Sequence, residues 1–133
     1  MKGLTAKMTR PLPLGAWLTC ADNSGTKELE LIAVKGYHGR LRRLPRAGVG
    51  DVIMCSVKKG KEKLRHTVVH AVVVRQKKEY MRYDGTRIKF SDNAAVLVNP
   101  KTYEPTGTEI RSVIAKEVVE RFTAIGKIAS MVL

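Results

Sequence analysis

Lysine and arginine side chains between positions 35 and 90 form the largest set of residues whose chemistry follows from type and spacing. This stretch holds 16 cations and 4 anions, and it carries nearly all of the formal net charge of +13. A field of this sign attracts polyanions, of which nucleic acid is the usual one. The candidate phosphate-binding residues are Lys35, Arg40, Arg42, Arg43, Arg46, Lys58, Lys59, Lys61, Lys63, Arg65, Arg75, Lys77, Lys78, Arg82, Arg87 and Lys89.

These cations fall into three separate elements. Residues 35–50 contain five Gly or Pro residues and no acid, a composition typical of a flexible arm. A predicted turn carries Lys58, Lys59, Lys61, Lys63 and Arg65. The remaining cations lie on a predicted ribbon at 75–90. A single charge of this kind is usually solvated, but three basic elements together indicate many phosphate contacts.

Aromatic side chains are too few to provide many stacking platforms for nucleic-acid bases. The chain has one Trp, four Tyr and two Phe residues. Tyr37, Tyr80 and Tyr83 lie among the cations, but the supply is poor for a protein that reads single strands by stacking. The sequence therefore favours recognition of an RNA backbone by its shape over base-by-base reading.

The residue types needed for catalysis do not converge in the sequence. His66 and His70 have the spacing of two metal ligands on a helix, but they lie in or beside a predicted strand, where four residues span about 13 Å. Gly48-Val49-Gly50 is too short and wrongly placed for a nucleotide-binding fingerprint. Aspartates in turns commonly accept hydrogen bonds from backbone amides, and four follow this pattern: Asp22, Asp51, Asp84 and Asp92. We expect no enzymatic activity, no metal and no cofactor.

Cysteine usage and hydropathy bound the class of protein. Cys20 and Cys55 are far apart in apolar, strand-like surroundings, which favours buried free thiols over a disulfide or a metal site. The chain contains no uniformly apolar run of about 18 residues, and its N-terminus has no apolar signal core. The sequence predicts one folded domain of 133 residues that stays in the cytosol and contacts no membrane.

The basic ribbon belongs to a longer stretch, residues 71–98, which joins an apolar run to a hairpin and then to a second apolar strand. Asp84-Gly85 is a strong signal for a two-residue hairpin loop. That loop predicts a register in which Arg82 faces Arg87. Because like charges directly opposite each other are destabilising, this pair predicts an anion lying over both side chains; the alternative is that both point into solvent.

Five short runs of apolar and β-branched residues, separated by Gly-rich turns, predict a small five-stranded antiparallel β-barrel. Closure of the sheet would remove its exposed edges. The run at 68–74 is short and mostly β-branched, which favours a buried strand over a helix. The predicted strands are 17–21, 28–34, 51–57, 67–75 and 94–98.

The barrel is expected to occupy residues 14–98, with a different kind of segment on each side. Residues 1–13 carry three cations and no acid, and their prolines favour an extended basic arm. Residues 99–133 are expected to form a loop and a short helix. From position 91 onward the chain has five cations and five anions. This part therefore has no net charge, and we do not expect it to bind phosphate groups.

The C-terminal segment predicts a helix with one apolar stripe. The stripe consists of Ile114, Val118, Phe122 and Ile125. Ser112 would cap this helix, Gly126 would end it, and Glu117 and Arg121 would form a favourable pair outside the stripe. The stripe either packs on the barrel mouth or, together with the apolar tail 128–133, contacts another protein or an RNA surface.

A motif in the stretch 71–98 resembles that of a known family, ribosomal protein fourteen of the large subunit. The motif consists of the apolar quartet 71–74, Asp84-Gly85, Phe90, Asn93 and Val96-Leu97 at fixed offsets. Further segments that resemble this family are 21–25, 47–51 and Gly107-Thr108, so the resemblance covers residues 17–133. The prolonged N-terminal arm and the insertion at 40–46 resemble its archaeal and eukaryotic branch.

The resemblance implies a structural protein of the cytoplasmic ribosome, with a five-stranded barrel and a C-terminal loop-and-short-helix region. It implies direct binding of large-subunit rRNA, a place at the interface with the small subunit, contacts to small-subunit rRNA, and neighbouring large-subunit ribosomal proteins. It also implies a docking surface for the anti-association initiation factor six, which we assign to residues 112–133 because the C-terminal segment is neutral. The alternative is a free RNA-binding or translation-factor module with a similar barrel.

Overall fold

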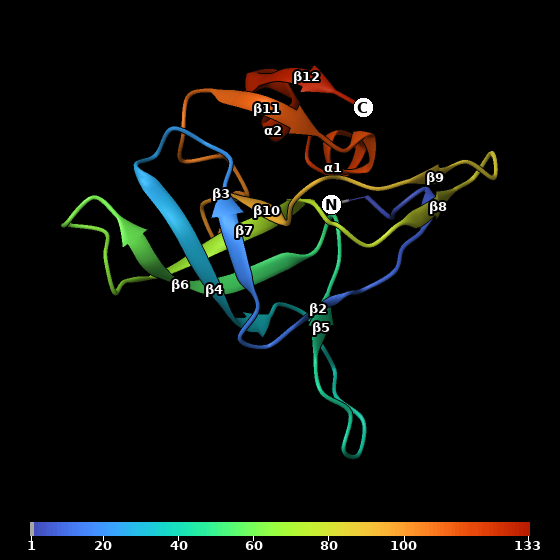
Figure 1. The fold of residues 1–133 in the computed structure, drawn as a ribbon, viewed down its shortest axis with the longest axis horizontal. Coiled ribbons are helices and arrows are strands. Elements are labelled where there is room, and N and C mark those ends of the chain that lie inside the picture. Colours follow the sequence, from blue (N-terminus) through green and yellow to red (C-terminus); the bar gives the residue numbers. More distant parts are fainter. Residues whose placement is uncertain (1) are drawn as a thin grey trace.

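Five strands close into a barrel at the centre of the chain (Figure 1). The computed structural model describes residues 2–133. The barrel strands are β3 (Trp17–Cys20), β4 (Thr26–Val34), β6 (Val52–Gly60), β7 (Val68–Arg75) and β10 (Ala94–Leu97). Each corresponds to one of the five predicted runs, so the prediction of a mainly β fold with a five-stranded barrel is confirmed.

One seam of the barrel is parallel. Strand β10 pairs in parallel with β3, whereas the other four neighbouring pairs are antiparallel. The prediction of a wholly antiparallel barrel is corrected on this point. A ring with an odd number of strands cannot alternate in direction all the way round, so closure requires at least one parallel pair.

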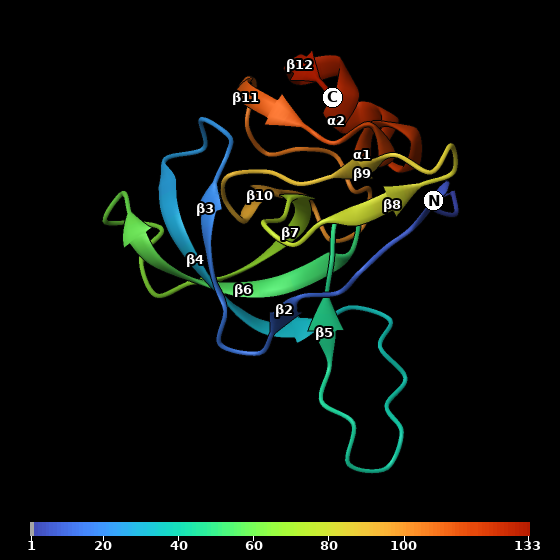
Figure 2. The ribbon, with the colours of Figure 1, turned by 45° about the vertical axis from the view of Figure 1, so that its right-hand side comes forward.

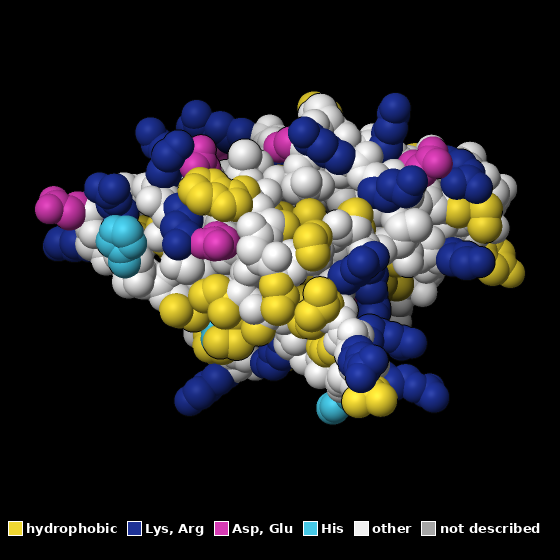
Figure 3. Space-filling model, turned by 60° about the horizontal axis from the view of Figure 1, so that its bottom comes forward, with side chains coloured by type: hydrophobic (Ala, Val, Ile, Leu, Met, Phe, Trp, Pro, Cys, Tyr) yellow, Lys and Arg dark blue, Asp and Glu magenta, His cyan; other side chains and the backbone are white. Residues whose placement is uncertain are grey.

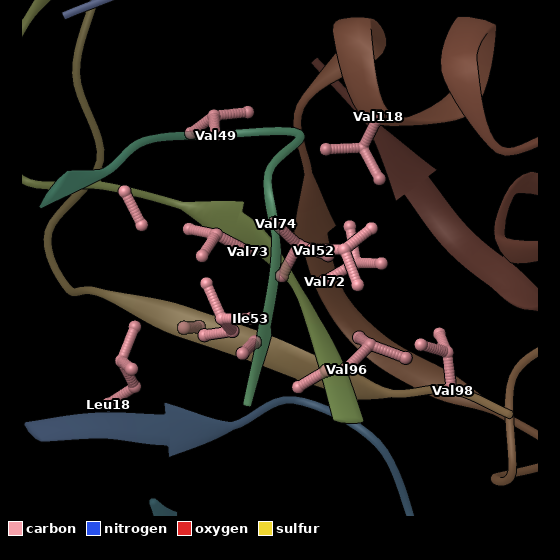
Figure 4. Packing of buried hydrophobic residues seen from close by; sticks show 14 of the residues in the cluster. Leu18, Val49, Val52, Ile53, Val72, Val73, Val74, Val96, Val98 and Val118 are labelled. Atoms are coloured by element: carbon pink, nitrogen blue, oxygen red, sulfur yellow. The ribbon is translucent and has the colours of Figure 1, made fainter. Parts of the chain in front are cut away.

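Strand β7 is buried on both faces, which explains its uninterrupted apolar run. Val72, Val73 and Val74 are all 0% exposed. Because successive side chains of a strand point to opposite faces, one face of β7 packs inside the barrel and the other packs against the C-terminal region. In Figure 4, Val73 lies on the side of Ile53, while Val72 lies toward Val118 of helix α1 (Lys116–Arg121). The core therefore continues from the barrel to the C-terminal helices.

Strand β6 is longer than predicted. It reaches Gly60, so Lys58 and Lys59 lie in the strand and the turn that follows comprises residues 61–67. Gly60 has a φ of 155°, and a Cβ atom there would stand 2.8 Å from the Gly25 carbonyl oxygen. The absence of a side chain thus lets the ends of β4 and β6 approach closely.

The N-terminal segment is extended and pairs with other parts of the chain. Strand β1 (Ala6–Lys7) pairs with β8 (Tyr80–Arg82), and β2 (Leu12–Pro13) pairs with β5 (Arg46–Ala47). These pairings hold parts of the predicted arm in an extended conformation, and residue 1 of that arm lies outside the described residues. Buried Gln76 joins this arm to the barrel.

The Gln76 side chain satisfies polar groups from two distant segments. Its Oε1 atom accepts a hydrogen bond from Val49 N at 2.9 Å, and its Nε2 atom donates to Thr9 Oγ1 at 2.9 Å. Gly48 lies beside this contact, and a Cβ atom there would stand 2.4 Å from the Thr9 carbonyl oxygen. The arm therefore packs against a position that only glycine can occupy without displacement.

The basic ribbon has a different register from the one predicted. Strands β8 and β9 (Arg87–Ile88) place Tyr80 opposite Ile88 and Met81 opposite Arg87. Arg82 N donates to Thr86 O at 2.8 Å, so the connection has three residues, 83–85, and not two. The predicted Arg82–Arg87 pair is wrong, and so is its use as evidence for a bound anion. When one strand shifts its register by one residue, its side chains exchange faces relative to those of the partner strand.

The C-terminal region contains two short helices between two strands. It comprises β11 (Ile110–Ile114), α1 (Lys116–Arg121), α2 (Thr123–Ile128) and β12 (Ala129–Val132). Strands β11 and β12 pair in parallel beside the barrel (Figure 1). In residues 2–133, no helix has the length and apolar character needed to cross a bilayer.

The single predicted helix is wrong, but its apolar stripe is buried. Ser112 lies in β11 instead of capping a helix, because residues 110–114 pair with β12. Helix α1 begins after Ala115 and ends before Phe122, which separates it from α2. Gly126 lies inside α2. The four stripe residues are at most 5% exposed, which confirms that the stripe packs in the core. Glu117 does not pair with Arg121; it is buried and contacts the ribbon.

Candidate nucleic-acid interface

The first group of cations lies on loop 35–45, which projects from the barrel (Figure 2). Arg40, Arg42 and Arg43 are exposed on the loop, and Arg46 is exposed on strand β5. Arg43 N donates to Arg40 O at 2.9 Å, and Arg42 has a φ of 59°, which places a tight turn among these residues. A basic loop that stands away from the barrel can reach a large polyanion without rearrangement of the core.

Lys35 anchors the root of this loop. Its Nζ atom donates to the Pro100 carbonyl at 3.2 Å and lies 4.7 Å from the centroid of the Tyr103 ring. A cation over an aromatic face is attracted by the ring quadrupole. Lys35 therefore joins the base of loop 35–45 to the loop that follows β10, and Lys35 itself remains exposed.

The second group lies on the turn between β6 and β7. Lys61, Lys63 and Arg65 are exposed and form no ion pair within residues 2–133. The two lysines that precede them differ, because they form cross-strand pairs with β4. Lys58 Nζ lies 2.7 Å from Glu30 Oε2, and Lys59 Nζ lies 3.1 Å from Glu28 Oε2. The free charge of this group is therefore concentrated at the turn.

The third group lies on the ribbon. Lys77, Lys78 and Lys89 are exposed, and Arg87 is 63% exposed with Nη1 at 3.4 Å from Glu79 Oε1. Figure 3 shows the face from which the long loop comes forward. Lys and Arg side chains are numerous over this view, acidic side chains are few, and hydrophobic side chains gather near its centre. The cations are thus spread over a wide surface and do not form one compact pocket.

Arg75 is structural. It is 9% exposed, its Nε and Nη2 atoms donate to the Asp92 carboxylate at 2.8 and 2.9 Å, and its Nη1 atom donates to Val113 O at 2.8 Å. Burial acts to raise the pKa of Asp92, but the Arg75 hydrogen bonds and charge outweigh it and lower the pKa. The bidentate pair joins the end of β7 to the chain before β10.

Arg82 is also part of an internal cluster. Its Nε atom donates to Glu117 Oε1 at 2.7 Å, and it also donates to the carbonyl of Leu133. Tyr80 Oη donates to Glu117 Oε2 at 2.7 Å. Burial, followed by the Glu117 contact, raises the pKa of Tyr80, and the hydrogen bond to Glu117 raises the pKa of Arg82. This cluster holds the ribbon against α1 and the C-terminus.

The three tyrosines that lie among the cations have different surroundings. Tyr80 is 0% exposed and is not available for stacking, whereas Tyr83 is 96% exposed at the end of the ribbon. Tyr37 is half-buried at the base of the long loop, and its hydroxyl donates to Arg43 O at 3.2 Å. Tyr37 is therefore the aromatic residue that combines a fixed position with partial exposure.

Three of the four aspartates accept hydrogen bonds from backbone amides, as predicted, whereas Asp92 accepts from the Arg75 side chain. Asp22 accepts from Ser24 N at 3.1 Å, Asp51 accepts from Gly48 N at 2.9 Å, and Asp84 accepts from Thr86 N at 3.0 Å. Hydrogen bonds from the Thr86 side chain and backbone lower the pKa of Asp84. Within the described range 2–133, no group of three His, Cys, Asp or Glu residues is arranged to hold a metal ion.

Both cysteines are free thiols, which confirms the prediction. Cys55 is buried in the barrel, and Cys20 is half-buried on β3. Burial raises the pKa of Cys20 to about 11 and that of Cys55 to about 12. Both groups therefore remain protonated near neutral pH, where a thiol is a poor nucleophile and a poor metal ligand.

Comparison with known proteins matches this fold to one family. A model of the family "Ribosomal protein L14p/L23e" matches residues 12–133. The chain belongs to this family. The protein named large ribosomal subunit protein uL14 from Methanococcus vannielii is 52% identical over 132 residues, which is 99% of each chain. Its namesake from Thermoplasma acidophilum is 53% identical over 133 residues, which is 100% of each chain.

Membership of the L14p/L23e family confirms the resemblance seen in the sequence, including its archaeal character, because these relatives come from archaea. An L14p/L23e protein is a ribosomal protein with a structural and non-enzymatic role in translation, located in the cytoplasmic ribosome. The barrel, the basic arm and the ribbon are thus elements of a ribosomal protein.

One residue of this L14p/L23e chain that belongs with the basic groups was missed in the sequence. Arg10 lies in the N-terminal arm, yet it lines a groove together with Arg42, Arg43 and Arg46 of the long loop. Its side chain is 58% exposed, and its Nε atom lies 3.5 Å from Asp51 Oδ2. The pairing of β2 with β5 brings it there, and only its position before Pro11-Leu12-Pro13 hinted at an extended path toward the loop.

Proposed function

We propose that this L14p/L23e chain binds large-subunit rRNA directly and lies at the interface with the small subunit. The observation that supports direct binding is the separation of charge. Three basic groups are exposed on the long loop 35–45 with β5, on the β6–β7 turn and on the ribbon. The segment after residue 90 carries no net charge. A surface that neutralises many phosphates binds RNA by releasing condensed counterions.

The proposed phosphate contacts are the exposed members of the candidate set together with half-buried Lys58. Arg75 and Arg82 satisfy internal carboxylates, and we assign them a supporting role for the ribbon and its neighbours. The residues proposed to contact phosphate are Lys35, Arg40, Arg42, Arg43, Arg46, Lys58, Lys59, Lys61, Lys63, Arg65, Lys77, Lys78, Arg87 and Lys89.

The neutral C-terminal segment is proposed to meet other partners. Strand β12 ends in exposed apolar side chains, with Met131 58%, Val132 46% and Leu133 52% exposed. Apolar groups on a neutral strand suit a protein partner better than RNA phosphates. We propose residues 112–133 as the docking surface for the anti-association initiation factor six, beside contacts with small-subunit rRNA and neighbouring ribosomal proteins.

Salt-dependent binding tests the division of surfaces. A triple Lys61→Ala, Lys63→Ala and Arg65→Ala variant should lower the slope of log affinity for large-subunit rRNA against log salt by about two to three units, because each phosphate contact releases a counterion. The matched control is a triple Lys101→Ala, Arg111→Ala and Lys127→Ala variant, which removes the same charge from the neutral segment. Its slope should stay at the wild-type value.

Two results would contradict the proposal. Equal slope changes in the two triple variants would mean that net charge alone, and not the three basic groups, governs binding. A wild-type protein that stays off the large subunit during sedimentation of a low-salt lysate would instead favour a free RNA-binding or translation-factor module.

A further inference from the structure

A basic groove lies where the long loop meets the N-terminal arm. Its volume is about 620 Å³, and its lining consists of Arg10, Tyr37, Arg42, Arg43, Leu44 and Arg46. The lining residues come from the segment before β2, the long loop and the start of β5, so tertiary structure assembles it. Asp51, which pairs with Arg10, is the acidic neighbour of this lining.

The charge of this groove distinguishes it from a second, larger groove. The other groove, of about 980 Å³, lies between the N-terminal arm, the ribbon and α1. Its lining balances the cations Lys7, Arg82 and Lys116 with the anions Asp84, Glu117 and Glu120. Four guanidinium groups with no acid in the lining make the smaller groove the one suited to an anionic ligand.

Tyr37 gives this groove an aromatic surface in a fixed position. The Tyr37 hydroxyl is held by Arg43 O at 3.2 Å, and Tyr37 N donates to Val34 O at 3.4 Å. Leu44 adds an apolar side chain that is 71% exposed. A ring, an apolar neighbour and several guanidinium planes are the groups on which an unstacked RNA base stacks.

We propose that this groove binds one unstacked ribonucleotide of rRNA, with the base against Tyr37 and the flanking phosphates among the arginines. The inference rests on the proposed function and adds a position at which the protein contacts a base as well as the backbone. The volume lies in the range of pockets that enclose small ligands. A paired base in a duplex is stacked on both sides and cannot present its face to the ring, so the groove selects single-stranded RNA.

Fluorescence titration of the full-length protein tests this inference. The probe is a single-stranded RNA of about twelve nucleotides with 2-aminopurine at its centre, because the fluorescence of this base falls when it stacks. Tyr37→Leu removes the ring and keeps all charges. It should weaken binding about tenfold and abolish quenching, with the salt slope unchanged, since base stacking is largely independent of counterion release.

Two variants act as controls. Tyr37→Phe keeps the ring without the hydroxyl and should retain quenching, with affinity within about twofold of the wild type. Tyr83→Leu removes an aromatic ring that is 96% exposed and lies outside the groove, and it should bind like the wild type. Circular dichroism checks that each variant is folded.

The outcomes separate this inference from the proposed function. Binding of intact large-subunit rRNA together with unchanged affinity and quenching in Tyr37→Leu would overturn the nucleotide groove alone. Equal binding of the same RNA annealed to its complement, or an equal loss in Tyr83→Leu, would also overturn it. Failure of the wild-type protein to bind large-subunit rRNA would reject the proposed function itself.

Discussion

At the scale of single residues, Glu117 decides how the ribbon sits on the rest of the protein. Its side chain is 2% exposed, and its two oxygen atoms accept hydrogen bonds from Tyr80 and Arg82. A buried carboxylate is tolerated only when cations and donors surround it. Arg82, like Arg75, therefore differs from the exposed cations of the ribbon, because its charge is already compensated inside the protein.

Replacing Arg82 with Ala should lower the free energy of unfolding by about 3 to 5 kcal/mol, because Glu117 would remain buried without its cation. Urea denaturation measures the loss. Arg87→Ala is the matched control on the same ribbon, and because Arg87 is 63% exposed its expected loss is below about 1 kcal/mol. Comparable losses in the two variants would contradict the structural role of Arg82.

At the scale of elements, the long loop is separable from the barrel. The loop joins β4 to β5, and its contact with the N-terminal arm is the short pairing of β2 with β5. The side chains Leu41 and Leu44 are 90% and 71% exposed, so the outer part of the loop adds little to the core. The outer part of the loop therefore contributes little to the stability of the fold.

Replacing residues 38–44 with a short Gly-Ser linker should leave the thermal midpoint within a few degrees of the wild type. The salt slope for large-subunit rRNA should fall by about two to three units, because Arg40, Arg42 and Arg43 are lost. A variant with these three arginines changed to Gln in an intact loop should show the same slope. Unfolding of the linker variant would show that the loop supports the barrel.

At the scale of the whole molecule, the net positive charge is separated from the neutral C-terminal region. The basic groups belong to residues 35–90, whereas the exposed apolar strand β12 closes the neutral C-terminal region. The buried stripe of the helices packs this region onto β7, so the barrel and the C-terminal region share one core. One chain can then contact RNA with one part and a protein with another.

Met131→Asp should weaken binding of the anti-association factor to reconstituted large subunits about tenfold, or about 1.4 kcal/mol, because an unpaired carboxylate would be buried in an apolar contact. Cosedimentation measures both this and the retention of the protein on rRNA, which should not change. Val68→Asp is the control, since Val68 and Met131 are both 58% exposed. An equal effect of the two substitutions would argue against a specific C-terminal surface.

The five barrel strands, the buried stripe, the free thiols and the turn-capping aspartates were predictable from sequence. Each depends on local information, namely the period of apolar residues, β-branching and the turn preferences of Gly and Asp. The motif around Asp84-Gly85 also sufficed to indicate the family. These features could be predicted because each depends on residues close together in the sequence and on which of them are buried.

Tertiary structure decided the features that depend on distant pairing. Arg82 became an internal cation because a three-residue connection shifts the ribbon by one position and because α1 presents Glu117 to it. The predicted helix begins only after Ala115, because β12 pairs with β11 and holds residues 110–114 in a strand. Arg10 and Tyr37 meet in one groove only through the β2–β5 pairing. Composition determined that the chain attracts a polyanion, but which cations remain free to bind it depends on the carboxylates that folding places beside them.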